Sequence, residues 1–180
     1  MVQKENKILI HACCAICSGY PISLLKEMGY TPVVFFSNSN LNTKEEFERR
    51  LEAEKTLCMY HWVDLIIDKY NHEEFLELVK GLENEPERGK RCDECIKYRL
   101  KKTAEKAKEL EIGQFTTSLV ISPHKNFEKI SNIGKSLENG VKYIPIDFKK
   151  KDGFLKTNKL SKDLGLYRQN YCGCEFSLKK

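Results

Sequence analysis

Short apolar runs alternate with helical periodicities along most of the chain. The runs are typical of buried strands, and the segments between them repeat apolar residues every three or four positions, as an amphipathic helix does. The pattern predicts strands at Lys7–His11, Pro32–Ser37, Trp62–Asp68, Phe115–Ser122 and Val141–Phe148. It predicts helices at Ser18–Met28, Thr43–Tyr60, His72–Gly81, Cys95–Glu111, Asn126–Glu138 and Lys159–Leu164. Alternation of this kind predicts an α/β fold, a mostly parallel sheet flanked by helices on both faces.

Capping residues suggest where two of these helices begin and end. Ser18 can cap the helix that runs to Met28, and Gly29 follows at the point where that helix should stop. Thr43 precedes the next helix and has Glu46 three residues further on, which is the spacing of a capping box. Both helices are therefore predicted from local signals as well as from periodicity.

Length and composition narrow the class of protein. The 180 residues suit one domain with a real core, and we expect residues 1–180 to form a single domain because no linker or repeat interrupts them. No run of about 18 apolar residues suggests a membrane span. The N-terminal apolar stretch is too short for a signal peptide, so we expect a cytoplasmic location, where thiols stay reduced or bind metal. The formal net charge of +5 suits a polyanionic partner without requiring one.

Seven of the eight cysteines fall into three groups, near the start, the middle and the end of the chain. The groups are Cys13, Cys14 and Cys17; Cys92 and Cys95; and Cys172 and Cys174. Several thiolates brought together hold iron–sulfur clusters, zinc or copper(I). The first group directly follows the first strand, and ligands of parallel sheets lie beyond the carboxyl ends of the strands. We therefore expect a cysteine-rich metal site at that edge.

Three interpretations of these cysteines compete. Disulfides are disfavoured, because bridges between adjacent or nearly adjacent cysteines are strained and the compartment looks reducing. A single structural zinc needs four ligands, such as both C-x-x-C pairs, and leaves three clustered cysteines without a role. An iron–sulfur cluster takes about four thiolates and leaves about three for a second metal or for redox chemistry. We favour the cluster.

Adjacent cysteines point in different directions, so Cys14 and Cys17 are expected to supply two sulfurs of one centre rather than Cys13 and Cys14. The eighth cysteine, Cys58, lies in an apolar helical context and is expected to be a small buried core residue. His61 and His72 are expected at the surface, near helix ends. None of these three residues is assigned chemistry.

Three other residues are candidates for chemistry. His11 precedes the first cysteines and could be a ligand, a proton donor or a hydrogen-bond partner of a sulfur, while a buried neutral histidine explains it equally well. Asp93 and Glu94 lie inside the second C-x-x-C and could supply an oxygen ligand or a proton. Carboxylates at the start of a helix are also favoured by the helix dipole alone, so both interpretations stay open.

Basic residues gather beside the second and third cysteine groups. Arginine and lysine near aromatic rings suit phosphate contacts and base stacking in RNA, although a solvated helix face explains such charges as well. Arg168 lies between Tyr167 and Tyr171. The other basic positions are Arg88, Lys90, Arg91, Lys97, Arg99, Lys101, Lys102 and Lys149–Lys151.

Five motifs follow one another in order along nearly the whole chain. They are H-x-C-C-x-x-C at His11–Cys17, R-C-x-x-C-x-x-x-R-L at Arg91–Leu100, T-T-S-L-x-x-S-P-x-K at Thr116–Lys125, I-D-F-K-K at Ile146–Lys150 and Y-R-Q-x-Y-C-G-C at Tyr167–Cys174. Together they resemble the motifs of the QueH-type epoxyqueuosine reductases. One departure is Ile16, where relatives often carry proline, which leaves the set of cysteines unchanged.

The resemblance implies a reaction and its cofactors. The epoxide of epoxyqueuosine at the tRNA wobble position would be reduced to the alkene of queuosine, with loss of water, use of two electrons and no cobalamin. It implies a Rossmann-like fold of the kind found in HUP and PP-loop proteins, a [4Fe-4S] cluster and a second metal ion, expected to be iron. The partners would be tRNA and a low-potential electron donor such as ferredoxin or flavodoxin.

A site built from all three cysteine groups would lock the chain ends to the sheet edge. We therefore predict that Cys92 and Cys95 bind the cluster together with Cys13 (or Cys14) and Cys174 (or Cys172). The remaining sulfurs, Cys14, Cys17 and Cys172, are predicted to hold the second metal, whose open position would act as a Lewis acid on the epoxide oxygen. An acid must protonate that oxygen, and the candidates are His11, Asp93 and Glu94.

The basic stretches are predicted to hold the anticodon stem-loop. The residues assigned to tRNA are Arg91, Arg99, Lys101, Lys102, Lys125, Lys149, Lys150, Tyr167 and Arg168. One alternative is a zinc-stapled RNA-binding module without redox activity. A second is tRNA thiolation by an ATP-using relative, which is weakened because cysteines follow the first strand in place of a Gly/Ser-rich phosphate loop.

Overall fold

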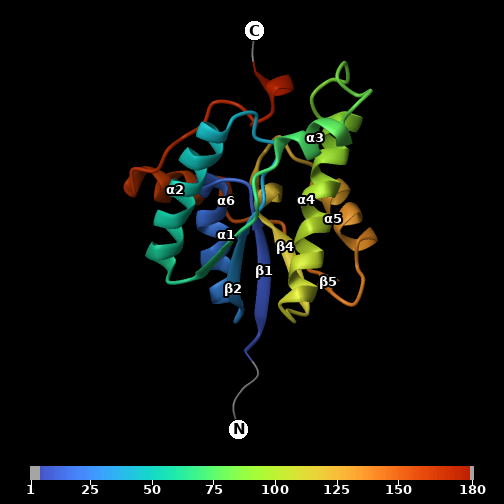
Figure 1. The fold of residues 1–180 in the computed structure, drawn as a ribbon. Helices are drawn as coiled ribbons and strands as arrows, with labels where there is room; N and C mark the ends of the chain where they lie inside the picture. Colours follow the sequence, from blue (N-terminus) through green and yellow to red (C-terminus); the bar gives the residue numbers. More distant parts are fainter. Residues whose placement is uncertain (1–4, 179–180) are drawn as a thin grey trace.

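All strands of the computed structural model, which describes residues 5–178, belong to one parallel sheet (Figure 1). The strands are β1 (Lys7–Ala12), β2 (Thr31–Phe36), β3 (Asp64–Ile67), β4 (Gln114–Thr117) and β5 (Lys142–Tyr143). Their order is β3-β2-β1-β4-β5, and every neighbouring pair is parallel. β2 and β3 follow on one side of β1, and β4 and β5 lie on its other side, which is the Rossmann arrangement. The predicted fold class is therefore confirmed.

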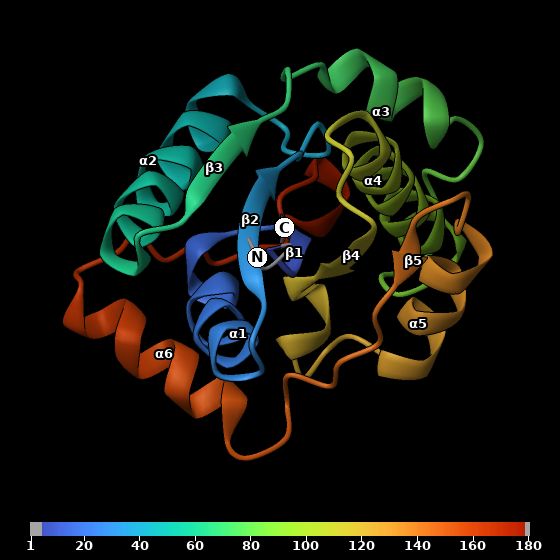
Figure 2. The same cartoon turned by 90° about the horizontal axis from the view of Figure 1, so that it is seen from below.

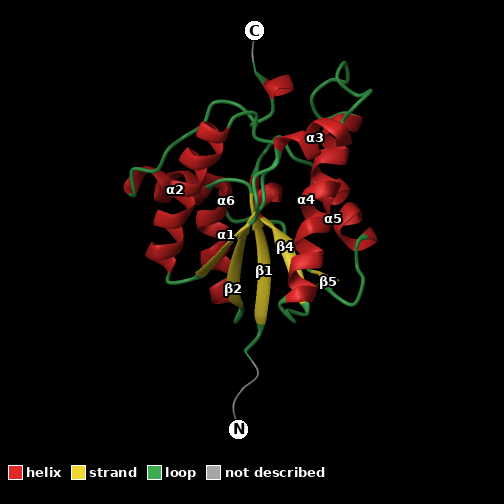
Figure 3. Ribbon diagram, viewed as in Figure 1, coloured by secondary structure: helices red, strands yellow, loops and turns green. Residues whose placement is uncertain are grey.

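Helices cover the sheet on both faces (Figures 2 and 3). No helix among residues 5–178 is both long and apolar enough to cross a membrane. The helices are α1 (Ala15–Glu27), α2 (Lys44–His61), α3 (His72–Leu78), α4 (Lys90–Glu109), α5 (Phe127–Ser136) and α6 (Gly153–Asp163), with 3₁₀ turns η1 (Ser118–Ile121) and η2 (Glu175–Ser177).

The central strand β1 is buried on both of its faces. Ile8 and Ile10 lie in one apolar cluster with Leu25 of α1, whereas Leu9 lies in a second cluster with Ala107 of α4. A parallel strand covered on both sides needs apolar residues in succession rather than in alternation, which is the pattern of the first predicted strand. The start of β1 and the turn η2 lie at opposite edges of the molecule, with the segment that carries η2 over the carboxyl ends of the strands (Figure 1).

Three predicted strands are shorter than expected. The strand predicted at Trp62–Asp68 forms only β3, Asp64–Ile67. The strand predicted at Phe115–Ser122 leaves the sheet after Thr117, whose side chain accepts a hydrogen bond from the backbone N–H of Leu119 and starts η1. The strand predicted at Val141–Phe148 pairs only over the two residues of β5. Pro145 interrupts that run, and a proline has no N–H to donate to a ladder.

The cap predicted for the first helix is wrong. This helix, α1, begins at Ala15, with Cys14 at the N-cap and Ser18 inside the first turn. The Ser18 hydroxyl donates to the carbonyl of Cys14 at 2.8 Å instead of accepting from the backbone. The cap predicted for α2 is confirmed, because Thr43 Oγ1 accepts from the backbone N–H of Glu46 at 3.1 Å.

Two helices begin earlier than predicted. α4 begins at Lys90 rather than at Cys95, which places the whole second cysteine pair on its first turns. α6 begins at Gly153 rather than at Lys159. A side chain at Gly153 would collide with the backbone carbonyl of Phe148, so only glycine permits the close approach that starts this helix.

The two histidines expected at the surface pack against other parts of the chain. His61 is buried, and His72 bonds the carbonyl of Ser39 and the carboxylate of Glu175, each at 2.8 Å. Both predictions are wrong because each helix end is covered by other parts of the chain. Cys58 is buried in the core, as predicted.

Candidate metal centre

The first cysteine group forms a compact set of sulfurs. The Sγ atoms of Cys13, Cys14 and Cys17 all lie within 4.8 Å of one another, and those of Cys13 and Cys14 are 3.9 Å apart. A tetrahedral ion with metal–sulfur bonds of about 2.3 Å holds its sulfurs about 3.8 Å apart. The spacing therefore suits one metal ion. The expectation that adjacent Cys13 and Cys14 diverge is wrong, since their sulfurs lie close enough for one ion.

The switch point of the sheet places this set. β1 ends at Ala12, and the turn that follows lies against the end of β4. The backbone N–H of Cys13 donates to Ser118 Oγ at 3.4 Å, and the Cys13 sulfur lies 3.6 Å from the same oxygen. The turn is thus held by η1, which follows β4, at the edge where Rossmann-like sheets bind ligands.

Hydrogen bonding within the set divides the sulfurs into two kinds. Hydrogen bonds from the thiols of Cys14 and Cys17 lower the pKa of Cys13 well below its usual range, which favours Cys13 as the thiolate of the set. Sharing that thiolate raises the pKa of Cys14 and of Cys17 above the ordinary value. A metal ion bound by all three sulfurs would therefore displace protons from two of them.

His11 is completely buried beneath this turn. Its Nδ1 lies 3.1 Å from Thr117 Oγ1, and its Nε2 lies 3.0 Å from the carbonyl of Ser37. Burial lowers the pKa of His11 to about 4. Both ring nitrogens are engaged. The geometry therefore favours the interpretation of His11 as a neutral histidine that fixes the strand ends, rather than as a proton donor or ligand.

Glu54 lies in the same region and was not predicted from the sequence. Its carboxyl group is fully buried; one oxygen accepts from Ser18 Oγ at 3.3 Å, and the other has no partner. Burial raises the pKa of Glu54 to about 8. It looks like an ordinary helix carboxylate in sequence, and no local pattern distinguishes it.

The four remaining clustered cysteines line one small cavity of about 20 Å³, formed by the start of α4 and the C-terminal segment. They are Cys92, Cys95, Cys172 and Cys174. Outside the first set, no three ligand atoms of His, Cys, Asp or Glu among residues 5–178 lie within 4.8 Å of one another. These sulfurs are therefore spaced more widely than one ion requires.

The structure groups the cysteines differently from the prediction. Cys13 was predicted with Cys92, Cys95 and Cys174, but it lies with Cys14 and Cys17. Cys172 was predicted with Cys14 and Cys17, but it lines the four-cysteine cavity. The two C-x-x-C pairs also lie in different sets, so the single zinc site considered from the sequence is not formed.

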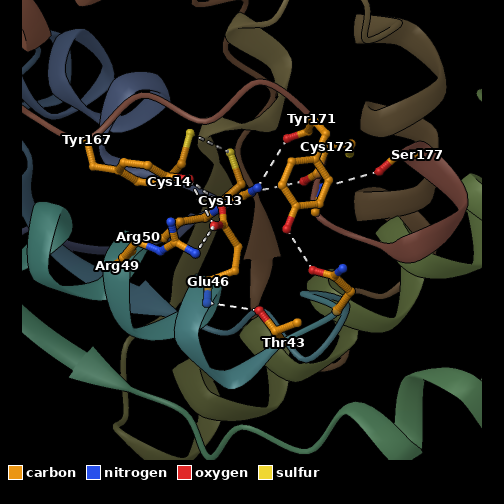
Figure 4. Close-up of polar contacts among 12 residues, drawn as sticks. Cys13, Cys14, Thr43, Glu46, Arg49, Arg50, Tyr167, Tyr171, Cys172 and Ser177 are labelled. Carbon is orange, nitrogen blue, oxygen red and sulfur yellow. Dashed lines mark hydrogen bonds and ion pairs between the residues drawn. The ribbon is translucent and has the colours of Figure 1, made fainter. Parts of the chain in front are cut away.

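A buried ion pair on α2 fastens the C-terminal segment to the sheet edge (Figure 4). Arg50 donates to the carbonyl of Cys172 at 3.0 Å and to that of Tyr171 at 3.1 Å. Its Nε donates to Glu46 at 2.7 Å, and the Tyr167 hydroxyl donates to the same carboxylate at 2.9 Å. Both charged side chains are 3% exposed. We call these contacts the α2 strap.

Glycine is required between the last two cysteines. Gly173 has a φ of +134°, and a Cβ on it would collide with Leu41 Cδ2. Its carbonyl accepts from the backbone N–H of Asn42 at 2.8 Å, and the Tyr171 hydroxyl donates to the Asn42 side chain at 2.7 Å. The turn that presents Cys172 and Cys174 is therefore fixed on both sides.

Two arginines assigned to tRNA are buried instead. Arg91 is 2% exposed and donates to three carbonyls of the preceding loop, including those of Glu83 and Glu85. Arg99 is 3% exposed and donates to Asn38 at 3.5 Å. Both line the four-cysteine cavity, so the prediction that they contact tRNA is corrected.

The other residues assigned to tRNA differ in accessibility. Lys101, Lys150 and Arg168 are exposed. Lys102 is half-buried and pairs with Asp68 at 2.8 Å. The tRNA role of the exposed three stays a prediction, whereas Lys102 already has a carboxylate partner.

Lys125 and Lys149 lie close to the cysteines. Lys125 Nζ is 3.9 Å from the Cys172 sulfur, and Lys149 Nζ donates to the Lys125 carbonyl at 2.7 Å. The ring of Tyr167, predicted to stack on a base, lies 5.5 Å from the guanidinium of Arg49. The contacts of the two lysines place them beside the four-cysteine cavity, whereas Tyr167 lies against α2.

Next to the cavity is a larger cleft of about 440 Å³, which we call the α4–α5 cleft. Asp93 lines it and pairs with Lys129 at 2.7 Å, whereas Glu94 is not among its lining residues. Arg88 and His124 also line it and lie 2.8 Å apart. Sequence reasoning missed Lys129 and His124, which carry no motif of their own.

Comparison with known proteins gives a consistent family. The profile of the family described as "Epoxyqueuosine reductase QueH" matches residues 8–180. The chain is 39% identical to the epoxyqueuosine reductase QueH of Streptococcus pyogenes, over 98% of this chain and 73% of that protein. It is 37% identical to the protein of that name from Thermotoga maritima, over 95% of this chain and 90% of that one.

A solved structure shares the fold at low identity. The U34-tRNA thiolase NcsA from Methanococcus maripaludis, solved with its [4Fe-4S] cluster, superposes with a TM-score of 0.61 at 17% identity. The match covers 99% of this chain and 63% of that one. At this identity the likeness shows the shared fold alone.

Proposed function

The chain belongs to the epoxyqueuosine reductase QueH family, and on that premise we propose that it reduces epoxyqueuosine to queuosine at the wobble position of tRNA. The epoxide oxygen leaves as water once two electrons and two protons have been supplied. Such an oxidoreductase needs a source of single electrons, a group that polarises the oxygen and a proton donor.

The observation that carries the proposal is a set of unpartnered polar atoms around the four-cysteine cavity. Asn40 Oδ1, Arg91 Nε and Arg99 Nε are all buried without a hydrogen-bond partner, and all three residues line this cavity. An unsatisfied buried donor costs about 1–3 kcal/mol. A site with several such atoms beside four thiols suits a group that brings its own acceptors.

We therefore propose that the four cysteines of the cavity hold a [4Fe-4S] cluster, whose sulfides would accept from the two guanidinium groups. A cluster with four thiolates is anionic, and a buried anion needs buried positive charge nearby. Arg91 and Arg99 supply it, and Arg99 also raises the acidity of Cys95, whose pKa burial raises to about 11. Reduction potentials of such clusters respond to hydrogen bonds of this kind.

The compact set of Cys13, Cys14 and Cys17 suits a second metal ion, for which we propose iron. Three sulfurs leave one position of a tetrahedral ion open for a substrate oxygen. When bound, the cluster would supply electrons and the single ion would polarise the epoxide oxygen. His11 and Ser118 would hold the turn that carries the three sulfurs.

Asp93 is the one predicted acid that lines the α4–α5 cleft, beside Cys92. We propose that the ion pair of Asp93 and Lys129 lies at the reacting group, where the Lys129 ammonium group held by Asp93 would give a proton to the departing oxygen and regain one from solvent. A low-potential donor such as ferredoxin or flavodoxin would supply the electrons.

Two alternatives make different demands on the same residues. A zinc-stapled RNA module would leave the orphaned guanidinium nitrogens of Arg91 and Arg99 without acceptors. Thiolation by an ATP-using enzyme, suggested by the shared fold, needs a phosphate loop after β1, and Cys13 and Cys14 stand there instead.

Anaerobic turnover tests the proposal. Iron-reconstituted protein is incubated with epoxyqueuosine-bearing tRNA and a low-potential reductant, and the nucleosides are analysed by mass spectrometry. We expect queuosine, which lacks the epoxide oxygen, and none from zinc-loaded protein. Fully iron-loaded protein that leaves epoxyqueuosine unchanged would contradict the proposal.

A further inference from the structure

The α4–α5 cleft lies directly beside the proposed cluster. Its volume of about 440 Å³ is within the range of small-molecule sites, roughly 300–1,000 Å³. Cys92 lines both this cleft and the four-cysteine cavity, so its side chain stands between the two spaces. A molecule in the cleft would therefore lie against a proposed cluster ligand.

The lining of the cleft combines an apolar floor with a cationic rim. Ile96 and Ile130 are buried at its base, and the rim carries Arg88, Lys125 and Lys129. Lys129 is neutralised by its carboxylate partner, but no carboxylate of residues 5–178 lies within 4.0 Å of Arg88 or Lys125. Two positive charges are thus left for an anion.

The backbone holds Arg88 in a conformation that costs energy. Its φ is +69°, in the left-handed region, where a side chain is disfavoured by about 1–2 kcal/mol relative to glycine. In this conformation its backbone N–H donates to the Cys92 sulfur at 3.3 Å, while its guanidinium donates to His124 Nδ1 at 2.8 Å. Strain of this kind persists where the side chain has a use.

The loop that carries Arg88 is also held by the side chain of Arg91. Arg91 donates to the carbonyls of Leu82, Glu83 and Glu85, so the segment before α4 is tied to the first turn of that helix. The guanidinium of Arg88 is therefore presented at the rim by a backbone with two independent anchors. A group on a fixed backbone can position a ligand with little loss of entropy.

We propose that the α4–α5 cleft binds the modified wobble nucleotide of the substrate, with its rings on Ile96 and Ile130 and its phosphate on Arg88 and Lys125. The proposal rests on the proposed function and extends it by naming the residues that seat the nucleotide. An apolar floor suits the planar base, and a fork of guanidinium donors suits a phosphate. Seated in this way, the base lies beside Cys92.

The substitution Arg88→Gly tests the proposed nucleotide site with little disturbance of the backbone. Glycine accepts the positive φ and keeps the backbone N–H that bonds to Cys92, so the iron content and visible spectrum should stay as in the parent protein. The probe is a fluorescein-labelled anticodon stem-loop carrying epoxyqueuosine, titrated anaerobically by fluorescence anisotropy. We expect the dissociation constant to rise about tenfold, as for loss of a charged hydrogen bond.

The salt dependence of stem-loop binding adds a measurement that a purely structural role of Arg88 would not change. Loss of one phosphate contact should lower the slope of log Kd against log salt by about one, and Arg88→Lys should restore most of that slope. The matched control is Lys135→Ala, an exposed cation at the far end of α5 that does not line the cleft. It should change Kd by less than about twofold.

The outcomes separate this inference from the proposed function. Unchanged affinity and salt slope in iron-replete Arg88→Gly would overturn the proposed nucleotide site, even if the parent protein converts epoxyqueuosine. Equal weakening by Arg88→Gly and Lys135→Ala would also overturn it, since general surface charge would then be responsible. A parent protein that binds the stem-loop through Arg88 but performs no reduction would contradict the proposed function alone.

Discussion

The two cysteine sets are assembled in different ways. Cys13, Cys14 and Cys17 come from one turn after the most buried strand, and the neighbouring 3₁₀ turn η1 holds that turn through Ser118. The four-cysteine cavity joins the start of α4 to a C-terminal segment far away in sequence. A local set forms with the sheet, whereas the distant set depends on tertiary contacts that fasten the segment. The cavity should therefore be the more fragile of the two metal sites.

Removal of a single ligand should separate the sets most strongly. Cys92→Ala should lose most of the iron and the visible absorbance of the cluster, because one of its four proposed ligands is gone. Cys14→Ala should keep that absorbance and lose only the second metal. Metal analysis and anaerobic absorption spectra of both variants check this, and parallel loss of cluster absorbance in both would show that the sets are not independent.

The α2 strap should carry the next largest effect. Arg50→Met leaves the buried carboxylate of Glu46 without its partner, which costs about 3–5 kcal/mol. It also frees the carbonyls of Tyr171 and Cys172, so iron bound in the cavity should fall while the compact set is retained. Urea unfolding and iron per chain are the measurements.

Two further variants show what the strap does. Arg49→Met changes the adjacent arginine, which is 59% exposed, and should leave iron content unchanged. The double variant Glu46→Leu with Arg50→Met removes both charges and should recover stability without recovering iron. Recovery of both would mean that the strap contributes only to folding.

The turn between the last two cysteines should have a smaller effect. Gly173→Ala places a methyl group against Leu41 at a φ of +134°. We expect a loss of about 1–3 kcal/mol and weaker iron binding. Gly165→Ala is the matched control, since Gly165 has a φ of +62° with open space around it. If it lowered iron content equally, backbone strain alone would explain the loss.

A further expected effect is a pH dependence from Glu54. In the metal-free folded protein the pKa of this carboxyl is raised to about 8, against 4.5 for an unperturbed group. The stability that its neutral form contributes is therefore full below pH 4.5 and is lost as the pH rises through about 8. Glu54→Gln should remove this part of the slope of unfolding free energy against pH.

Urea unfolding of the metal-free protein across that pH range measures the slope. Glu52→Gln, on the same helix with a side chain that is 71% exposed, should leave it unchanged. An equal slope in parent and Glu54→Gln would show that Glu54 is not the group responsible.

Local signals predicted the strands and the edge where the cysteines meet, but not how the cysteines divide. The division depends on the turn that brings Cys13, Cys14 and Cys17 together and on the path of the segment that carries Cys172, and neither is encoded in spacing. Glu46 and Arg50 have the spacing of an ordinary surface pair on a helix. Nothing in the sequence shows that Tyr167 and Tyr171 cover them.

One signal in the sequence could have found the buried arginines. Arg91, Cys95 and Arg99 recur every four residues, so they share one face of α4. A cysteine expected to bind metal on that face implies that the two arginines point toward the same site rather than toward tRNA. The basic composition of the stretch hid this, because exposed lysines such as Lys101 lie between them.

The separation of the two sets is tested most directly by an anomalous difference map at the iron edge, from crystals of the protein reconstituted and grown anaerobically. Our account predicts a large peak bounded by Cys92, Cys95, Cys172 and Cys174, and a second, smaller peak held by Cys13, Cys14 and Cys17. A single cluster ligated by Cys13, with Cys172 free or bound to a different ion, would contradict it.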